Sequence, residues 1–441
     1  MPREDLRTRL EAGDLWVRTA VVLWVLILIV VSLRVYKDAG KVVDAKQTKP
    51  ISQLLYEAGE HWIKGQPLYA DEGEYRYSPG VAAVLSLFVR AFSVRVAALL
   101  WLWMGAAAFF AGFVYWMRTS MPVARDRHYQ GLLVLLATPL LIGNFNTLQT
   151  NPVCLACMMV IVPATLRKQW LLAAVCIAVA TSLKVYPLAI ALVLLVLFPR
   201  RLWLATLVGL LFAGLLPFVL GETEYVVRCY REWVVGVMND DRSVRPLAVS
   251  YRDVALLWRD YAGYFDQVSY QFLQFIGALG VGAAADGLRW GGKPAGGMVL
   301  RSSQGHASAG GMVLPSSQGH ASGDSTQKSE QAKCHFLLGL VLCWVMLLGP
   351  STESATYMMM GPLAAWMILE GCVGKWRMTT QALAGMGYGI LVVTALVGTT
   401  PKGREFMTMG WQPVAAAFLL AGLVGWWRGA KPETGSPKSE G

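Results

Sequence analysis

The segment LWVRTAVVLWVLILIVVSL (Leu15–Leu33) decides the fold of this chain. A membrane-spanning helix needs roughly 17 to 25 predominantly apolar residues, and this segment meets that requirement with a single charge, Arg18. No small-x-small cleavage site follows it before Arg34 and Lys37, so we interpret it as an uncleaved membrane anchor and not as a signal peptide.

Similar apolar blocks recur along the whole chain. Of the 441 residues, 55% are hydrophobic and only 15% are charged, and the hydrophobic ones lie in long blocks. The block from Trp170 to Phe198 is too long for one span, and Lys184 and Pro187 interrupt it, so we divide it into two short helices. The fold class predicted is all-α, a polytopic bundle of about twelve transmembrane helices. These spans are expected to begin near residues 15, 95, 131, 152, 170, 187, 202, 270, 334, 356, 380 and 411.

The net charge of +11 follows the topology of a membrane protein. Lys and Arg lie in short clusters between apolar blocks, which is typical of cytoplasmic loops and does not indicate a nucleic-acid partner. With a cytoplasmic N-terminus, every inner loop is basic, and both termini lie inside. The clusters are Arg118, Arg125 and Arg127; Arg167 and Lys168; Arg200 and Arg201; Lys375 and Arg377; and Arg428 and Lys431.

This topology divides the chain into five parts. A cytoplasmic N-terminus (1–14) precedes a transmembrane domain (15–290) with outer loops at 34–78 and 221–269. A cytoplasmic insertion (291–333) follows, and then the rest of the transmembrane domain (334–428) and a tail (429–441). The insertion contains AGGMVLRSSQGHAS (Ala295–Ser308) and a near-identical copy, AGGMVLPSSQGHAS (Ala309–Ser322). It has too little apolar content to fold, so we expect it to be disordered.

The sequence excludes several kinds of chemistry. It has no Walker loop, dinucleotide-binding glycine fingerprint, HExxH or nucleophile elbow, so ATP-driven transport and soluble-type hydrolysis have no support. The pair Cys154 and Cys157 has the spacing of metal ligands but no partner ligands nearby, and we expect it to serve in packing. We expect neither a metal nor a cofactor.

Polar residues gather at the predicted outer face. The first outer loop interleaves carboxylates with aromatic rings, which suits a sugar as well as it suits an interfacial aromatic belt. Amides at the outer end of the third span either cap helices or line a wet cavity. The candidate substrate-binding residues from these two regions are Tyr56, Glu57, Tyr69, Tyr75, Tyr77, Asn144, Asn146 and Gln149.

Three cations have two interpretations. Lys184 lies within an apolar block, where it either extends to the lipid headgroups or holds an anion such as a lipid phosphate. Arg228 and Arg231 in the second outer loop have the same ambiguity.

Several segments resemble one family of membrane enzymes. GQPLYADEGEYRYSPGVAAVL (Gly65–Leu85), preceded by YEAGEHW (Tyr56–Trp62), resembles the first periplasmic loop of family-87 glycosyltransferases. These are GT-C class enzymes related to polyprenol-phosphate-mannose-dependent α-mannosyltransferases. Further segments resemble later blocks of that family in the same order: GNFNTLQTNP (Gly143–Pro152), SLKVYPL (Ser182–Leu188), FPRR (Phe198–Arg201) and GPSTESATYMMMGP (Gly349–Pro362).

The resemblance implies a transferase of the cell envelope in the inner membrane. It would move a sugar, mannose by analogy, from a polyprenyl-phosphate donor to a lipid, glycan or protein acceptor at the outer face. Enzymes of this class use a carboxylate of the first outer loop as the catalytic base. By role, Lys184, Arg228 and Arg231 would bind the donor phosphate, and Glu353 and Tyr357 would bind a sugar.

One departure concerns the base. The family has an acid shortly before the position of Tyr56, where this chain has Ile51, Ser52 and Gln53. The base is then Asp44, which we prefer, or Asp38; alternatively, the site is degenerate and the protein is an inactive relative.

A polytopic transporter or lipid flippase is the competing class. About twelve spans with both ends inside also fit a transporter. A transporter, however, places its polar residues near the middle of the membrane in two related halves, whereas here they gather at the outer face and the halves show no repeat.

Overall fold

The computed structural model describes residues 3–39, 51–69, 75–121, 126–238, 250–264, 266–290, 321–349, 352–374, 376–398, 403, 406 and 409–429. Regular structure in these ranges is helical throughout, and none of them contains a strand. The all-α prediction is therefore confirmed. Asp44 and most of the tandem repeat lie outside the described residues.

Five of the described helices are long and apolar enough to cross a membrane. They are α1 (Arg3–Asp38), α4 (Val94–Ser120), α9 (Pro199–Leu220), α12 (Gln267–Trp290) and α15 (Met378–Val397). Shorter apolar segments lie in α3 (Pro79–Ala91), α6 (Asn151–Leu166), α7 (Trp170–Leu183), α8 (Leu188–Leu197) and α13 (Ala321–Leu348). The chain is thus a polytopic helical membrane protein, although fewer helices than the twelve expected spans meet the criteria of length and composition by themselves.

The remaining helices differ more from the expected boundaries. The predicted outer loops contain α2 (Ile51–Lys64), α10 (Thr223–Met238) and α11 (Val254–Tyr261). Because α13 begins at Ala321, it includes residues 321–333, which we had assigned to the insertion. The other elements are α5 (Arg127–Asn146), the 3-10 helix η3 (Ser354–Met359), α14 (Met360–Val373) and α17 (Trp411–Gly429).

The division of the long apolar block is confirmed. α7 ends at Leu183 and α8 begins at Leu188, and Lys184 between them has an extended backbone with φ −149° and ψ 139°. Pro187 lies directly before α8, where a proline needs no helical hydrogen-bond partner for its nitrogen. This break places a lysine at the turn between two apolar helices.

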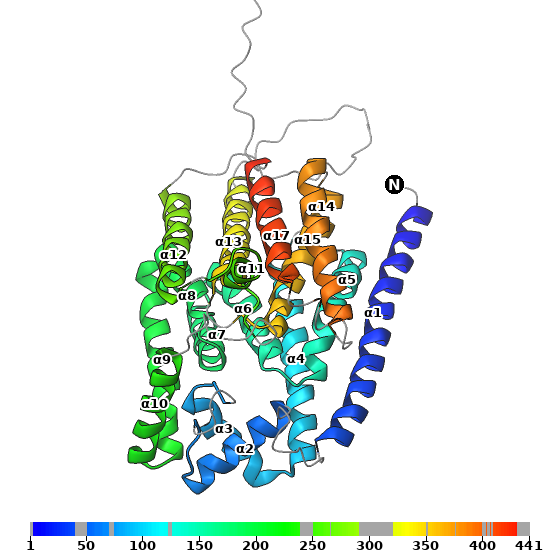
Figure 1. The fold of residues 1–441 in the computed structure, drawn as a ribbon. Coiled ribbons are helices and arrows are strands. Elements are labelled where there is room, and N and C mark those ends of the chain that lie inside the picture. Colours follow the sequence, from blue (N-terminus) through cyan, green and yellow to red (C-terminus); the bar gives the residue numbers. More distant parts are fainter. Residues whose placement is uncertain are drawn as a thin grey trace, which may run out of the picture.

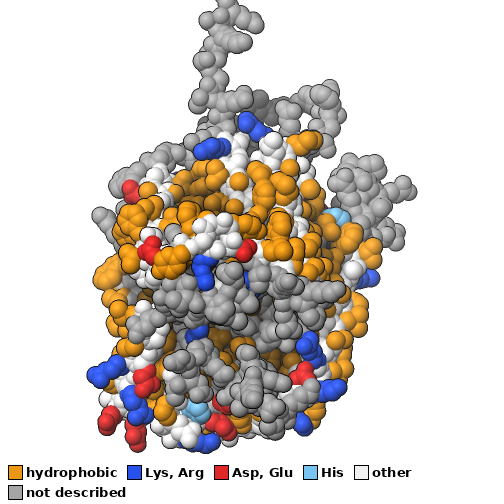
Figure 2. All heavy atoms as spheres, in the orientation of Figure 1, with side chains coloured by type: hydrophobic (Ala, Val, Ile, Leu, Met, Phe, Trp, Pro, Cys, Tyr) orange, Lys and Arg blue, Asp and Glu red, His pale blue; other side chains and the backbone are white. Residues whose placement is uncertain are grey.

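Figure 1 shows how the helices are arranged. α1 lies along one edge of the bundle, and α9 and α10 lie along another. α2, α3 and α10 gather at one end, while the N-terminal end of α1 and the C-terminal end of α17 lie toward the opposite end. In Figure 2 hydrophobic side chains cover much of the visible surface of the bundle, and charged side chains gather at the end formed by α2 and α10. This distribution fits a bundle surrounded by lipid, with a polar layer at one end.

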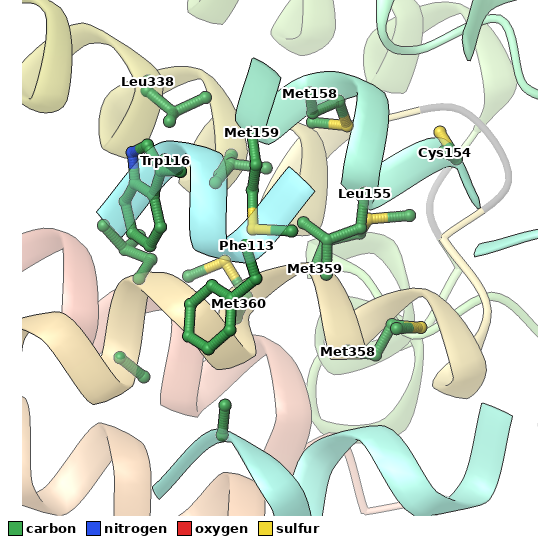
Figure 3. Close-up of a cluster of buried hydrophobic side chains, with 14 of the residues drawn as sticks. Phe113, Trp116, Cys154, Leu155, Met158, Met159, Leu338, Met358, Met359 and Met360 are labelled. Atoms are coloured by element: carbon green, nitrogen blue, oxygen red, sulfur yellow. The ribbon is translucent and has the colours of Figure 1, made fainter. Parts of the chain in front are cut away.

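A methionine-rich core joins the central helices (Figure 3). Phe113 of α4 and Met158 of α6 pack there with Met359 of η3, and all three are at most 2% exposed. Methionine adapts its shape to irregular spaces, so it suits a junction of several helices. The core anchors η3, which positions the residues just before it.

The helices α4 and α6 pack closely at a glycine. A Cβ added to Gly112 would lie 2.7 Å from the carbonyl oxygen of Ala156 and 2.9 Å from its Cα. Small residues allow membrane helices to approach in this way, because lipid provides no hydrophobic force to hold them together.

We expect Gly112→Ala to lower the free energy of unfolding by about 1–3 kcal/mol, because the added methyl group must push α4 and α6 apart. Gly105→Ala is the matched control in the same helix, since a Cβ there meets only the Pro152 Cβ at 4.0 Å. Thermal unfolding of the purified protein in detergent measures both variants. Equal melting temperatures for the two would contradict the close packing.

Candidate functional site

The structure brings four segments together into one polar cluster. They are residues 75–78 before α3, the turn 184–187 between α7 and α8, residues 250–253 before α11, and residues 352–357 around η3. We use the term tyrosine–lysine cluster for Arg76, Tyr77, Lys184, Tyr251 and Glu353, which interact with one another.

Lys184 is at the centre of this cluster. Its side chain is half-buried, and its Nζ lies 5.6 Å from the centre of the Tyr77 ring. The negative charge of Glu353 acts on this ammonium group and favours its charged form. Lys184 is therefore a cation at neutral pH, and an anion that enters the cluster meets a fixed positive charge.

The backbone of residues 75–78 is held by side chains on both sides. Tyr69 donates a hydrogen bond to the Tyr77 carbonyl at 2.8 Å, and Tyr75 donates to the Ser78 carbonyl at 3.3 Å. Ser78 Oγ in turn donates to the Ser182 carbonyl near the end of α7 at 2.9 Å. Burial raises the pKa of Tyr69 and of Tyr75, so both phenols stay protonated and keep donating. This segment is thus fixed beside Lys184.

Three tyrosine rings pack against one another along the same segment, in tilted arrangements. The rings of Tyr69 and Tyr75 lie 5.6 Å apart, and those of Tyr75 and Tyr77 also lie 5.6 Å apart. Tyr75 and Tyr77 are 6% exposed, so each presents only a small part of its surface. Most of the surface of these rings therefore packs against the protein and stabilises the cluster.

A pair of buried asparagines joins α5 and α6 to η3. Asn144 and Asn151 donate to the carbonyl of Ala355 at 3.0 and 3.1 Å, and Asn151 also donates to Asn144 Oδ1 at 2.8 Å. Asn144 is thus part of the framework. Asn146 and Gln149 are half-buried, and among the described residues their side chains have no hydrogen-bonding partner. They are the amides of this group that can bind a ligand.

η3 carries Glu353 and supports the segment before α11. Glu353 caps η3 from the position directly before it, where its N–H donates to Thr356 Oγ1 at 3.2 Å, and its side chain is half-buried. Tyr357 is 2% exposed, and its hydroxyl lies 2.7 Å from the carbonyl of Arg252. Arg252 N donates to the Thr352 carbonyl at 2.6 Å. Tyr357 therefore acts in this structure as a support for residues 250–253.

Other residues predicted for the site lie elsewhere. Arg228 donates to the Gly65 carbonyl at 3.2 Å and lies over the Tyr225 ring, and Arg231 is an exposed residue of the same helix. Asp38, at the end of α1, pairs with Arg34 one turn earlier at 3.5 Å. None of these contacts joins them to the tyrosine–lysine cluster, and their predicted roles stay predictions.

Tyr56 and Glu57 belong to α2. Tyr56 donates to the Phe92 carbonyl at 3.3 Å and lines a small, mostly apolar hollow between α2, α3 and α4. Glu57 is half-buried on the same helix. The surroundings of Tyr56 suit a hydrocarbon chain better than a sugar ring.

Three residues of the cluster and its framework were not among the predicted site residues. Arg76 and Tyr251 are in contact, and Asn151 joins Asn144 to η3. The sequence feature that could have identified Arg76 is its position between Tyr75 and Tyr77 in the segment Gly65–Leu85. Tyr251 had no local signal, because its partner lies 175 residues away in the chain.

No group of three metal-ligating side chains occurs among the described residues. Cys154 lies 3.9 Å from the Tyr186 hydroxyl, which fits its expected role in packing. The expectation that the protein needs no cofactor stays a prediction.

We expect Asn151→Ala to lower the free energy of unfolding by roughly 1–3 kcal/mol, because the change leaves Asn144 Oδ1 buried without this donor. Asn146→Ala is the matched control, since it removes an amide from the same region without a described partner. Thermal unfolding compares the two variants. A larger loss of stability in the control would show that this network does not hold the site.

Comparison with known proteins gives the same family as the sequence segments. The family model for glycosyltransferase family 87 matches residues 75–301, which is more than half of the chain. No match was found among curated proteins. The matched range includes Arg76, Tyr77, Lys184 and Tyr251 of the cluster, and Glu353 follows it. The chain therefore belongs to glycosyltransferase family 87 and is a membrane glycosyltransferase.

Proposed function

We propose that this glycosyltransferase moves mannose from a polyprenyl-phosphate donor to a lipid, glycan or protein acceptor at the outer face of the inner membrane. The observation that carries the proposal is the position of Lys184. It is a half-buried cation at a turn between two apolar helices, so a phosphate attached to a hydrocarbon chain can reach it while the chain stays in lipid. A water-soluble nucleotide sugar would gain nothing from this placement.

The neighbours of Lys184 fit both parts of such a donor. The ammonium group would bind the phosphate, and the adjacent Tyr77 ring would border the sugar. Glu353 would accept hydrogen bonds from sugar hydroxyl groups, and the amides Asn146 and Gln149 at the end of α5 and just after it would donate to such groups and accept from them.

The reaction needs a base as well as a leaving-group site. A carboxylate takes the proton of the acceptor hydroxyl while that oxygen forms a bond to the anomeric carbon. The bond between that carbon and the phosphate oxygen breaks, and the phosphate leaves with the electron pair. We assign the base to Asp44 in the first place and to Asp38 in the second. No metal takes part in the proposal, because Lys184 supplies the positive charge and the lipid-linked sugar is a co-substrate.

We expect the purified protein in liposomes to transfer radiolabelled mannose from polyprenyl-phosphate-mannose to extracted membrane lipids. Lys184→Gln should reduce kcat by about 10²-fold or more, because the leaving phosphate loses its cation. Arg127→Gln is the control for loss of a positive charge and should leave kcat unchanged. Arg127 pairs with Asp14 at 2.8 Å and lies at the start of α5, at the opposite end of that helix from Asn144.

Two further variants identify the base. One of the two variants, Asp44→Asn or Asp38→Asn, should abolish sugar transfer while the protein stays folded. The remaining variant should leave sugar transfer intact. Absence of transfer from every polyprenyl-linked sugar tested would overturn the proposal and favour an inactive relative. Transfer from a nucleotide sugar instead would overturn the assignment of the donor.

A further inference from the structure

Two cations interact with the same residue, Tyr251. Arg76 donates a hydrogen bond from its guanidinium group to the Tyr251 hydroxyl, and its Cζ lies 5.9 Å from the centre of that ring. Lys184 lies over Tyr77, the next residue after Arg76, and its charge also interacts with Tyr251. Arg76 and Lys184 therefore reach one region from two different segments.

The position of Arg76 is fixed through its backbone and its side chain. Trp233 of α10 donates to the Arg76 carbonyl at 3.2 Å, and Tyr69 holds the next carbonyl. Tyr251, which receives the guanidinium hydrogen bond, is only 3% exposed, whereas Arg76 itself is exposed. The guanidinium group is thus held from the protein side and accessible from the other, which is the arrangement of a preorganised binding group.

The chemistry of the proposed donor calls for a second cation. A sugar phosphodiester carries one negative charge, but the phosphate monoester that leaves carries close to two at neutral pH. A site that stabilises the transition state must therefore bind more negative charge than the substrate brings. One lysine balances the single negative charge of the substrate. An additional arginine balances the charge that develops on the phosphate when the bond breaks.

Resting on the proposed function, we propose that Arg76 is a second phosphate-binding residue, which forms with Lys184 a two-cation site for the leaving polyprenyl phosphate and is oriented by Tyr251. In this proposal Arg76 has the same role that the sequence suggested for Arg228 and Arg231. Arg228 instead ties α10 to the end of α2 through the Gly65 carbonyl.

The test compares Arg76→Gln, Arg76→Lys and Tyr251→Phe with Arg127→Gln as the control. We expect Arg76→Gln to lower kcat by about 10²-fold with a smaller change in KM, because the second cation acts mainly on the developing charge. Arg76→Lys keeps the charge and should recover part of the rate, although it lacks the planar fork of arginine. Tyr251→Phe keeps the ring but removes the hydroxyl group that orients Arg76. Its kcat should lie between those of the wild type and of Arg76→Gln.

Binding of farnesyl phosphate, with farnesol as the probe without phosphate, tests the site without turnover. The dissociation constant of farnesyl phosphate should rise roughly tenfold or more in Arg76→Gln, and that of farnesol should not change. Wild-type kcat and wild-type affinity for farnesyl phosphate in Arg76→Gln would overturn the inference. If wild type transfers no lipid-linked sugar, the proposed function fails, and the binding measurement still decides whether Arg76 holds a phosphate.

Discussion

The arrangement of the site depends on one buried amide, that of Asn151. It bridges the last turn of α5 and the carbonyl of Ala355, and so it joins the consecutive helices α5 and α6 to η3, which lies 204 residues further along the chain. Buried polar groups in a membrane protein have no water to bind, and a partner must come from the chain itself. Together with the Asn144 amide, which donates to the same carbonyl, this bridge adds a polar attachment to the apolar packing that holds η3 and the adjacent Glu353.

The fold was largely predictable because lipid imposes a simple rule. Long apolar blocks must become helices, and Lys184 with Pro187 marked the break between α7 and α8. The helices α2, α10 and α11 were not predicted, since they are amphipathic or short and their composition resembles that of loops. Their stability comes from packing against neighbours, which one sequence does not display.

The candidate site was predictable only in part. Lys184, Tyr77 and Glu353 were identified because a charge or a polar turn beside apolar helices stands out locally. Arg76 and Tyr251 were missed as a pair because their contact joins two loops through folding alone. The predicted base, Asp44, lies outside the described residues, and so the site is defined here by its cations and not by its base.

The short helices on either side of Lys184 also determine where the chemistry takes place. α7 has 14 residues and α8 has 10, which correspond to lengths of roughly 21 and 15 Å. Both are shorter than the hydrocarbon thickness of a bilayer, about 30 Å. If the ends of both helices that are remote from the turn meet the bilayer surface, the turn between them would lie below the level of the headgroups, or the bilayer would be thinner beside it. A lipid headgroup would meet the enzyme at that depth, so the isoprenoid chain need not be lifted into water.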